Sequence, residues 1–150
     1  MVHFRKIGFF PGILGVMFVF FILHNSYVKS THAQEKESEQ SKLLVVWTSG
    51  DKEVAEKMVF MYTYNAKKQG WFDEVQFLIW GPSSKLLSED TELQDYLKKM
   101  ENAGVELTAC IACANMYGVT DKLKELGVDV KGMGRPLTDM LKTGWVTITF

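Results

Sequence analysis

The chain has 150 residues, of which 47% are hydrophobic and 23% charged, a composition typical of one globular domain rather than two. Its formal net charge is −1, but residues 1–33 contain three basic and no acidic residues, so the remainder carries a net charge of −4. This mildly acidic remainder argues against nucleic acid as a partner, because binding to phosphates needs a basic face, and we expect none.

The chain opens with a short basic segment, Arg5 and Lys6, followed by an unbroken apolar run at residues 7–23. This order, followed by the small-x-small sequence that ends at Ala33, is typical of an export signal cleaved after Ala33. The alternative is an uncleaved membrane anchor, because the run has 17 residues, the lower limit for crossing a bilayer. Under both interpretations residues 1–33 direct the rest of the chain out of the cytoplasm.

A polar linker, residues 34–42, separates this leader from a folded domain at residues 43–150. Within the domain, short continuous apolar runs alternate with segments of helical spacing, and Gly or Pro separates them. The runs predict five strands, at 43–47, 75–80, 105–110, 128–133 and 145–150. We expect helices between Asp51 and Gly70, from a capping box at 91–94 to Gly104, after Cys113 to Leu126, and from Pro136 to Lys142.

The connections between these strands are too long for hairpins, which predicts an α/β fold with a mostly parallel five-stranded sheet. The domain is then a single three-layer unit, with Rossmann-like or flavodoxin-like layering of helices on both faces. The last strand alternates between apolar and polar residues. One of its faces is therefore expected to be partly uncovered, as at a sheet edge or a subunit contact.

Both cysteines of the chain, Cys110 and Cys113, lie where the third strand turns into a helix. Unpaired amides at a helix N-terminus favour thiolate over thiol, so sulfur chemistry is the first functional hypothesis. The carboxyl ends of parallel strands meet at one edge of a sheet, where ligands collect. At that edge we expect Arg135, Gly81 and Ser49 to contact substrate; the alternatives are a solvated arginine and, for Ser49, ordinary helix capping.

The histidines restrict the possible chemistry further. His3, His24 and His32 all lie in the leader, so the domain has none. Ser-His-Asp and Cys-His catalysis are therefore excluded, and a zinc site made of Cys and His ligands cannot form within one domain. We expect no metal site and no cofactor.

Residues 43–150 resemble the DsrE/DsrF-like family of small sulfur-handling proteins. The resemblance rests on four segments: the one that ends at Cys110, Gly118-Val119, residues 124–130, and the closing residues 137–150 with Gly144-Trp145. The resemblance implies a trimer, a hexamer or another oligomer, and a cysteine, matching Cys110, that carries sulfane sulfur as a persulfide between donor and acceptor proteins. Cys113 is an additional thiol, and the leader places this chain outside the cytoplasm.

Cys113 would assist Cys110 in this role, because it could resolve the Cys110 persulfide by forming a disulfide with Cys110. Two alternatives remain open from the residues alone. The cysteines could be structural, as a buried hydrophobe or a permanent bridge within a non-catalytic oligomeric scaffold. The CxxC pair could also belong to a dithiol-disulfide oxidoreductase, although its alanine neighbours and its place after the third strand are unlike thioredoxin.

Overall fold

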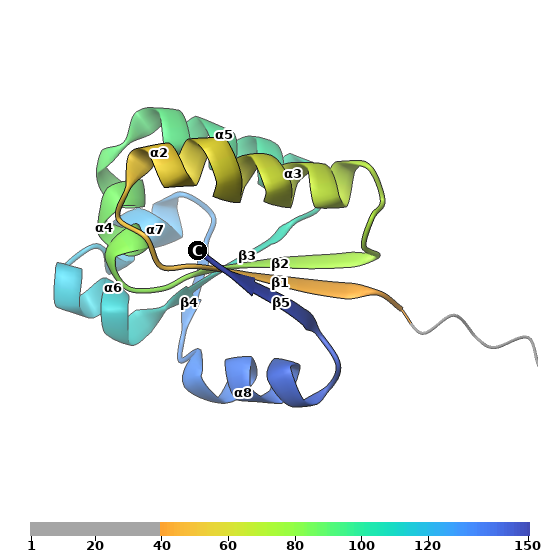
Figure 1. The fold of residues 1–150 in the computed structure, drawn as a ribbon. Helices are drawn as coiled ribbons and strands as arrows, with labels where there is room; N and C mark the ends of the chain where they lie inside the picture. The colour runs from red at the N-terminus through yellow and green to blue at the C-terminus, as the bar shows by residue number, and fades with distance from the viewer. Residues whose placement is uncertain (1–39) are drawn as a thin grey trace, which may run out of the picture. The chain divides into compact units, whose positions relative to one another are not determined.

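Five parallel strands form the centre of the structure, a computed structural model that describes residues 40–150. Their order across the sheet is β4-β3-β2-β1-β5, and every neighbouring pair is parallel. The predicted α/β class is thus confirmed, with an all-parallel sheet (Figure 1). The strands are β1 (Lys42–Trp47), β2 (Glu74–Ile79), β3 (Glu106–Cys110), β4 (Asp129–Lys131) and β5 (Val146–Thr149).

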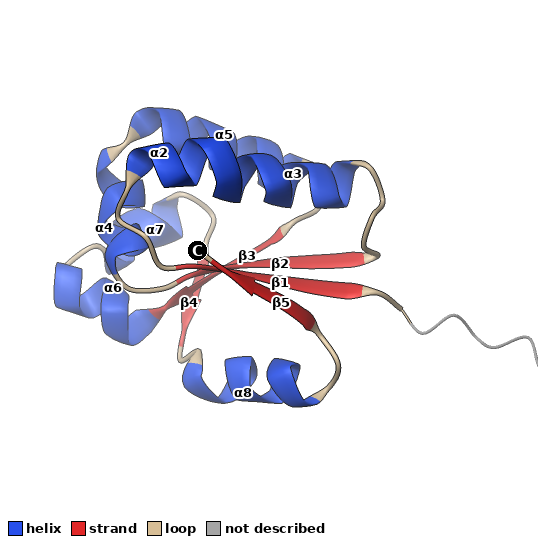
Figure 2. Ribbon diagram, viewed as in Figure 1, coloured by secondary structure: helices blue, strands red, loops and turns tan. Residues whose placement is uncertain are grey.

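Helices cover both faces of this sheet (Figure 2). One face is covered by a continuous helix made of α2 (Lys52–Val54), the π-helical segment η1 (Ala55–Phe60) and α3 (Met61–Lys68), together with α5 (Thr91–Asn102). The opposite face carries α8 (Gly134–Lys142). Three shorter helices follow the carboxyl ends of β2 and β3, namely α4 (Pro82–Glu89), α6 (Ile111–Tyr117) and α7 (Thr120–Glu125).

The larger core cluster lies between the sheet and the helix η1–α3 with α5, and aromatic rings fill its centre. Trp47 is fully buried and packs edge-on against Phe60 at 5.0 Å and stacked on Phe77 at 5.8 Å between ring centroids. The wider turn of the π-helical segment lets the consecutive residues Val59 and Phe60 both be buried against the sheet. Aromatic pairs in these geometries contribute about 0.5–1.5 kcal/mol each beyond their buried area.

The smaller core cluster lies on the α8 side of the sheet. It joins strand residues to Met133 and Met140, with half-buried Leu137 and Trp145 packed around them. Its buried strand residues are Leu44, Val46, Leu78 and Cys110. The side chain of Cys110 therefore faces α8, away from the larger cluster.

Several local features differ from the sequence expectations. The helix expected after Cys113 begins at Ile111, so Cys113 lies within α6, and the strand expected at 128–133 covers only Asp129–Lys131. The segment between the second strand and residue 91, for which the sequence predicted no helix, forms the helix α4, which begins at Pro82. The expected capping box at Thr91 is also wrong by one residue, because Asp90 is the N-cap of α5 and accepts a hydrogen bond from the backbone N–H of Leu93 at 3.1 Å. Asp90 also forms an ion pair with Lys52 at 2.9 Å, which lowers the pKa of that carboxyl.

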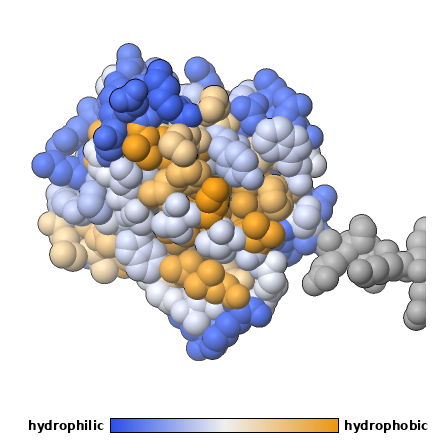
Figure 3. All heavy atoms as spheres, viewed as in Figure 1, coloured by the Kyte–Doolittle hydropathy of each residue, from blue (hydrophilic) through white to orange (hydrophobic). Residues whose placement is uncertain are grey.

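Strand β5 lies at the edge of the sheet beside β1, as the alternating pattern predicted. Its end is held by the backbone carbonyl of Phe150, which accepts hydrogen bonds from the N–H groups of Thr48 and Ser49 and from the Thr48 hydroxyl, at 2.6–3.2 Å. Val146 is 54% exposed. Apolar side chains gather on the face of the molecule where β5 lies, between α8 and the helix η1–α3 (Figure 3).

The expected signal or anchor at residues 1–33, with its apolar run at 7–23, lies outside the described residues. Among residues 40–150, no helix is both long enough and apolar enough to span a bilayer.

Candidate functional site at the end of strand β3

Cys110 is the last residue of β3 and the N-cap of α6, with φ −74° and ψ 114°. These extended backbone angles end the strand, and the small residues after it allow the immediate turn into the helix. The side chain is only 6% exposed, and it accepts no capping hydrogen bond from α6. The helix amides expected to stabilise its thiolate therefore do not contact it.

Cys113 lies in the first turn of α6 and is half-buried, so it is the more accessible of the two thiols. Both cysteines are free. Burial raises the pKa of Cys113, the backbone N–H of Gly81 opposes that rise, and the neighbouring Cys110 thiol adds to it. The two sulfurs are thus close enough to influence each other, and Cys113 is protonated at neutral pH.

Gly81, whose backbone N–H lowers the pKa of Cys113, has an unusual backbone conformation. Its φ of 76° with ψ of −136° lies in a region that only glycine adopts readily, so a side chain here would strain the backbone. The helix α4 begins directly after Gly81 and is anchored by its residue Ser83. The buried hydroxyl of Ser83 donates to the carbonyl of Trp47 at 2.6 Å and accepts from the N–H of Trp80 at 3.1 Å. The ends of β1 and β2 thereby fix the loop that meets Cys113.

The surroundings of the thiols are mostly apolar. Cys110 belongs to the cluster that contains Met133 and Met140, and both Cys113 and Trp80 pack against that cluster. One charged residue lies close by in the sheet, because Lys131 of β4 is the direct strand partner of Cys110. Its ammonium is paired with Asp129. Sequence reasoning did not select Lys131, since nothing in the sequence gives the register between β3 and β4.

The other two expected substrate residues, Arg135 and Ser49, form hydrogen bonds to residues near them in the chain. Arg135 is 85% exposed, and its Nε donates to both carboxylate oxygens of Asp139 at 2.8 Å. The hydroxyl of Ser49 accepts from the N–H of Asp51 at 3.1 Å, and Asp51 caps α2. Of the three, Gly81 is the one whose backbone N–H affects the pKa of a cysteine, Cys113.

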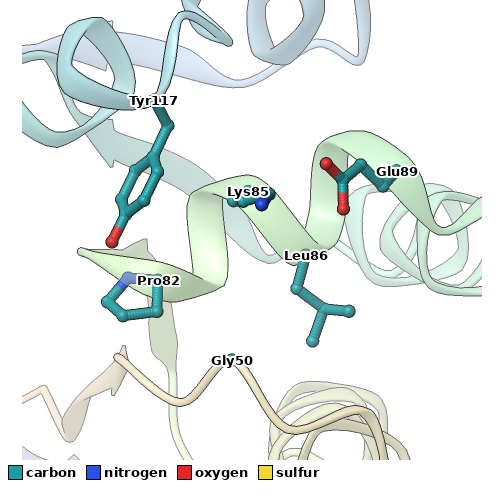
Figure 4. Close-up of a pocket in the computed structure, with 6 residues that line it drawn as sticks. All are labelled: Gly50, Pro82, Lys85, Leu86, Glu89 and Tyr117. Carbon is teal, nitrogen blue, oxygen red and sulfur yellow. The ribbon is translucent and has the colours of Figure 1, made fainter.

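A pocket of about 400 Å³ lies at the same edge of the sheet (Figure 4). It is lined by one residue of the loop after β1, four residues of α4 and the last residue of α6, namely Gly50, Pro82, Lys85, Leu86, Glu89 and Tyr117. Sequence reasoning missed its charged residues because α4 was not predicted. The only sequence signals for α4 were a proline suited to a first helical turn and a glycine before it.

The described residues contain no group of three or more His, Cys, Asp or Glu side chains that could hold a metal ion. The sulfur atoms of Cys110, Cys113, Met133 and Met140 are soft ligand atoms that lie in this region.

Comparison with known proteins connects this chain to a family. Residues 41–150 match the model of the DsrE/DsrF-like family. The chain is also 34% identical to a solved structure described as a conserved protein of unknown function, BT1422, from Bacteroides thetaiotaomicron. That match has a TM-score of 0.71 and covers 73% of this chain and 95% of the other. No curated protein matches the chain.

Proposed function

Because the chain belongs to the DsrE/DsrF-like family over residues 41–150, we propose that it carries sulfane sulfur as a persulfide on Cys110, with Cys113 assisting. The family points to a role related to sulfur relay. The observation that carries the proposal is the pair of free thiols at the end of β3, one buried and one half-exposed, close enough to influence each other.

The half-exposed thiol receives the sulfur first. The thiolate of Cys113 attacks the outer sulfur of a donor persulfide, R–S–SH. The donor S–S bond breaks, R–S⁻ leaves with the bonding electrons, and Cys113 becomes the persulfide. The thiolate of Cys110 then attacks that outer sulfur and becomes the carrier, which returns Cys113 to a thiolate. No net oxidation occurs in either transfer.

The sulfur has two routes away from Cys110. An acceptor thiolate that attacks the outer sulfur takes it as a new persulfide. If Cys113 attacks the inner sulfur instead, a Cys110–Cys113 disulfide forms and hydrosulfide is released. Burial of Cys110 supports the carrier role, because it shields a stored persulfide from solutes.

Intact-mass measurement tests this proposal. The reduced protein is incubated briefly with inorganic polysulfide without oxygen, and wild type is compared with Cys110→Ser, Cys113→Ser and the double variant. We expect wild type to gain one sulfur atom, located on Cys110 by fragmentation. Cys113→Ser should load more slowly, and Cys110→Ser should lose its sulfur faster to added thiol.

The double variant is the control for non-covalent sulfur. A wild-type mass gain no larger than that of the double variant would contradict the carrier role. Circular dichroism of each variant establishes that the fold is retained.

A dithiol oxidoreductase is the second candidate, favoured by the same free and neighbouring thiols. It predicts that the reduced protein cleaves insulin disulfides with no sulfur donor present, and that either single cysteine variant abolishes this. The scaffold alternative predicts neither activity.

We also propose that the protein is exported, with residues 7–23 as signal or anchor, and that it forms a homo-oligomer. Large apolar side chains on the surface support the homo-oligomer. Those that are more than half exposed include Met58, Met61, Trp71 and Val146. Protein that remained in the cytoplasm after fractionation of cells expressing the full chain would contradict export.

A further inference from the structure

The pocket beside α4 combines one cation, one anion, an apolar wall and a hydroxyl. Its volume of about 400 Å³ falls within the range of small-ligand sites. Figure 4 shows Lys85 and Glu89 on α4, Leu86 extending from α4 toward Gly50, and the Tyr117 hydroxyl reaching toward Pro82.

The two charges of the pocket are not paired with each other. Lys85 and Glu89 are four residues apart on α4, a spacing at which side chains are neighbours, yet neither forms an ion pair or a side-chain hydrogen bond within residues 40–150. Lysine before glutamate is the weaker order for such a pair, because it opposes the helix dipole. Both charges are thus available to a ligand that carries a carboxylate and an ammonium.

The remaining wall of the pocket can pack against a short apolar part of a ligand. Leu86 is half-buried, and Pro82 adds a rigid apolar surface. Tyr117 is 41% exposed, so its ring can cover a ligand while its hydroxyl forms a hydrogen bond.

The pocket and the more accessible thiol share two structural elements. Tyr117 follows Cys113 by four residues on α6, which places both side chains on the same side of that helix. Pro82 follows Gly81, whose N–H meets Cys113. The pocket is thus bounded by a residue of α6 that lies one helical turn from Cys113 and by the residue that follows Gly81.

We propose that this pocket binds the amino-acid portion of a low-molecular-weight aminothiol persulfide and directs its sulfur toward Cys113. Lys85 binds the carboxylate of the ligand, Glu89 binds its ammonium, and Leu86 packs against its methylene. The inference rests on the proposed function and names its donor class. The thiolate of Cys113 attacks the outer sulfur of the donor, whose S–S bond breaks, and the aminothiol leaves as a thiolate.

The first experiment measures binding without sulfur transfer. S-methylcysteine carries the same ammonium and carboxylate but cannot donate sulfur, and calorimetry gives its affinity for the reduced protein. We expect Lys85→Gln and Glu89→Gln each to weaken binding by about tenfold, as loss of one charge-assisted hydrogen bond does. Lys142→Gln, an exposed lysine of α8, is the matched control and should leave the affinity unchanged.

The second experiment compares two sulfur donors. With cysteine persulfide, Lys85→Gln, Glu89→Gln and Tyr117→Phe should each load the cysteines several-fold more slowly than wild type. With inorganic polysulfide, which lacks both charged groups, the same variants should load within about twofold of wild type.

The two experiments separate this inference from the proposed function. If polysulfide loads no sulfur but S-methylcysteine binds and depends on Lys85 and Glu89, the pocket assignment stands and the carrier role fails. If S-methylcysteine does not bind, or binds equally to wild type and both variants, the pocket assignment is overturned even when polysulfide loads Cys110.

Discussion

At the scale of single residues, the main feature of the site is the unequal environment of its two thiols. Cys110 is buried among methionine and leucine side chains, whereas Cys113 is half-buried and meets the N–H of Gly81. Burial raises the pKa of Cys113 above its ordinary value, so its reactive thiolate is scarce at neutral pH. A reaction at this cysteine must therefore become faster as the pH rises.

The rate of alkylation of Cys113 tests this directly. Below the raised pKa the thiolate fraction grows tenfold per pH unit, so we expect iodoacetamide to modify Cys113 about tenfold faster for each unit from about pH 7 to pH 9. Peptide mass spectrometry of the quenched protein gives the rate for each cysteine.

The variant Cys110→Ala is the informative comparison. The Cys110 thiol contributes to the raised pKa of Cys113, so its removal should speed modification of Cys113 at neutral pH. A rate that does not vary with pH would contradict the assigned environment.

The candidate site could be predicted only in part from the sequence. The spacing and the strand end identified Cys110 and Cys113, because strand and helix signals are local. The contact between Gly81 and Cys113 depends on the packing of α4 against α6, and the partnership of Lys131 with Cys110 depends on strand register. Neither has a local sequence signal. The substrate role of Arg135 stays a prediction; its guanidinium pairs with Asp139, one turn later on α8, and this ion pair also had no part in the sequence prediction.

At the scale of elements, two adjacent serines at the start of α4 differ in their hydrogen bonds, and only one of them attaches the helix to the end of the sheet. Ser83 and Ser84 are both fully buried. The hydroxyl of Ser83 bonds to the ends of β1 and β2, whereas the hydroxyl of Ser84 has no hydrogen-bond partner within the described residues. The position of Gly81 beside Cys113 thus depends on Ser83.

Replacing each serine by alanine should change stability in opposite directions. Ser83→Ala removes the hydroxyl that bonds to the Trp47 carbonyl and the Trp80 N–H, two groups that still bond to each other at 2.9 Å, and should lower the free energy of unfolding by about 0.5–1.5 kcal/mol. Ser84→Ala removes a buried, unpaired hydroxyl and should leave that free energy unchanged or raise it by up to about 1 kcal/mol. Urea unfolding of the two variants measures the difference, and equal losses would contradict the assignment.

The helix α4 shows where local sequence signals were insufficient. Most of its residues are polar or small, so it has few apolar positions at helical spacing, and its stability comes from the buried residues Ser83 and Leu87. Strand β1 was predicted from a continuous apolar run and β5 from alternating apolar and polar residues, and glycine or polar residues bound each predicted strand. At α5, Asp90 and Thr91 are both good capping residues, and the ion pair with Lys52 favours Asp90.

At the scale of the whole molecule, the order β4-β3-β2-β1-β5 leaves β5 as an edge strand. Its outer backbone groups have no strand beside them within residues 40–150, and Val146 is exposed there. Exposed edges are ready to pair with another chain. The strand pattern predicted this edge position, but nothing in the sequence alone identifies the surface that a second copy would cover.

Light scattering after size-exclusion chromatography tests self-association through this edge. We expect the wild-type protein to have a mass of several chains, and Val146→Lys to shift it toward one chain, because a charged edge disfavours pairing. Gln69→Lys, an equally exposed change at the end of α3, should have no effect. A wild-type monomer at every concentration, or an oligomer unaffected by Val146→Lys, would contradict this arrangement.

The hydrogen bonds between Phe150 and the residues after β1 have a consequence for synthesis. Thr48 and Phe150 are 102 positions apart, and β1 is flanked by β2 on one side and by β5 on the other. While the ribosome is still translating, β1 can pair with β2 but not with β5, so one side of a very apolar strand stays unprotected until translation of this region is complete. We therefore expect nascent chains stalled before Val146 to recruit chaperones, and complete chains to be released from them.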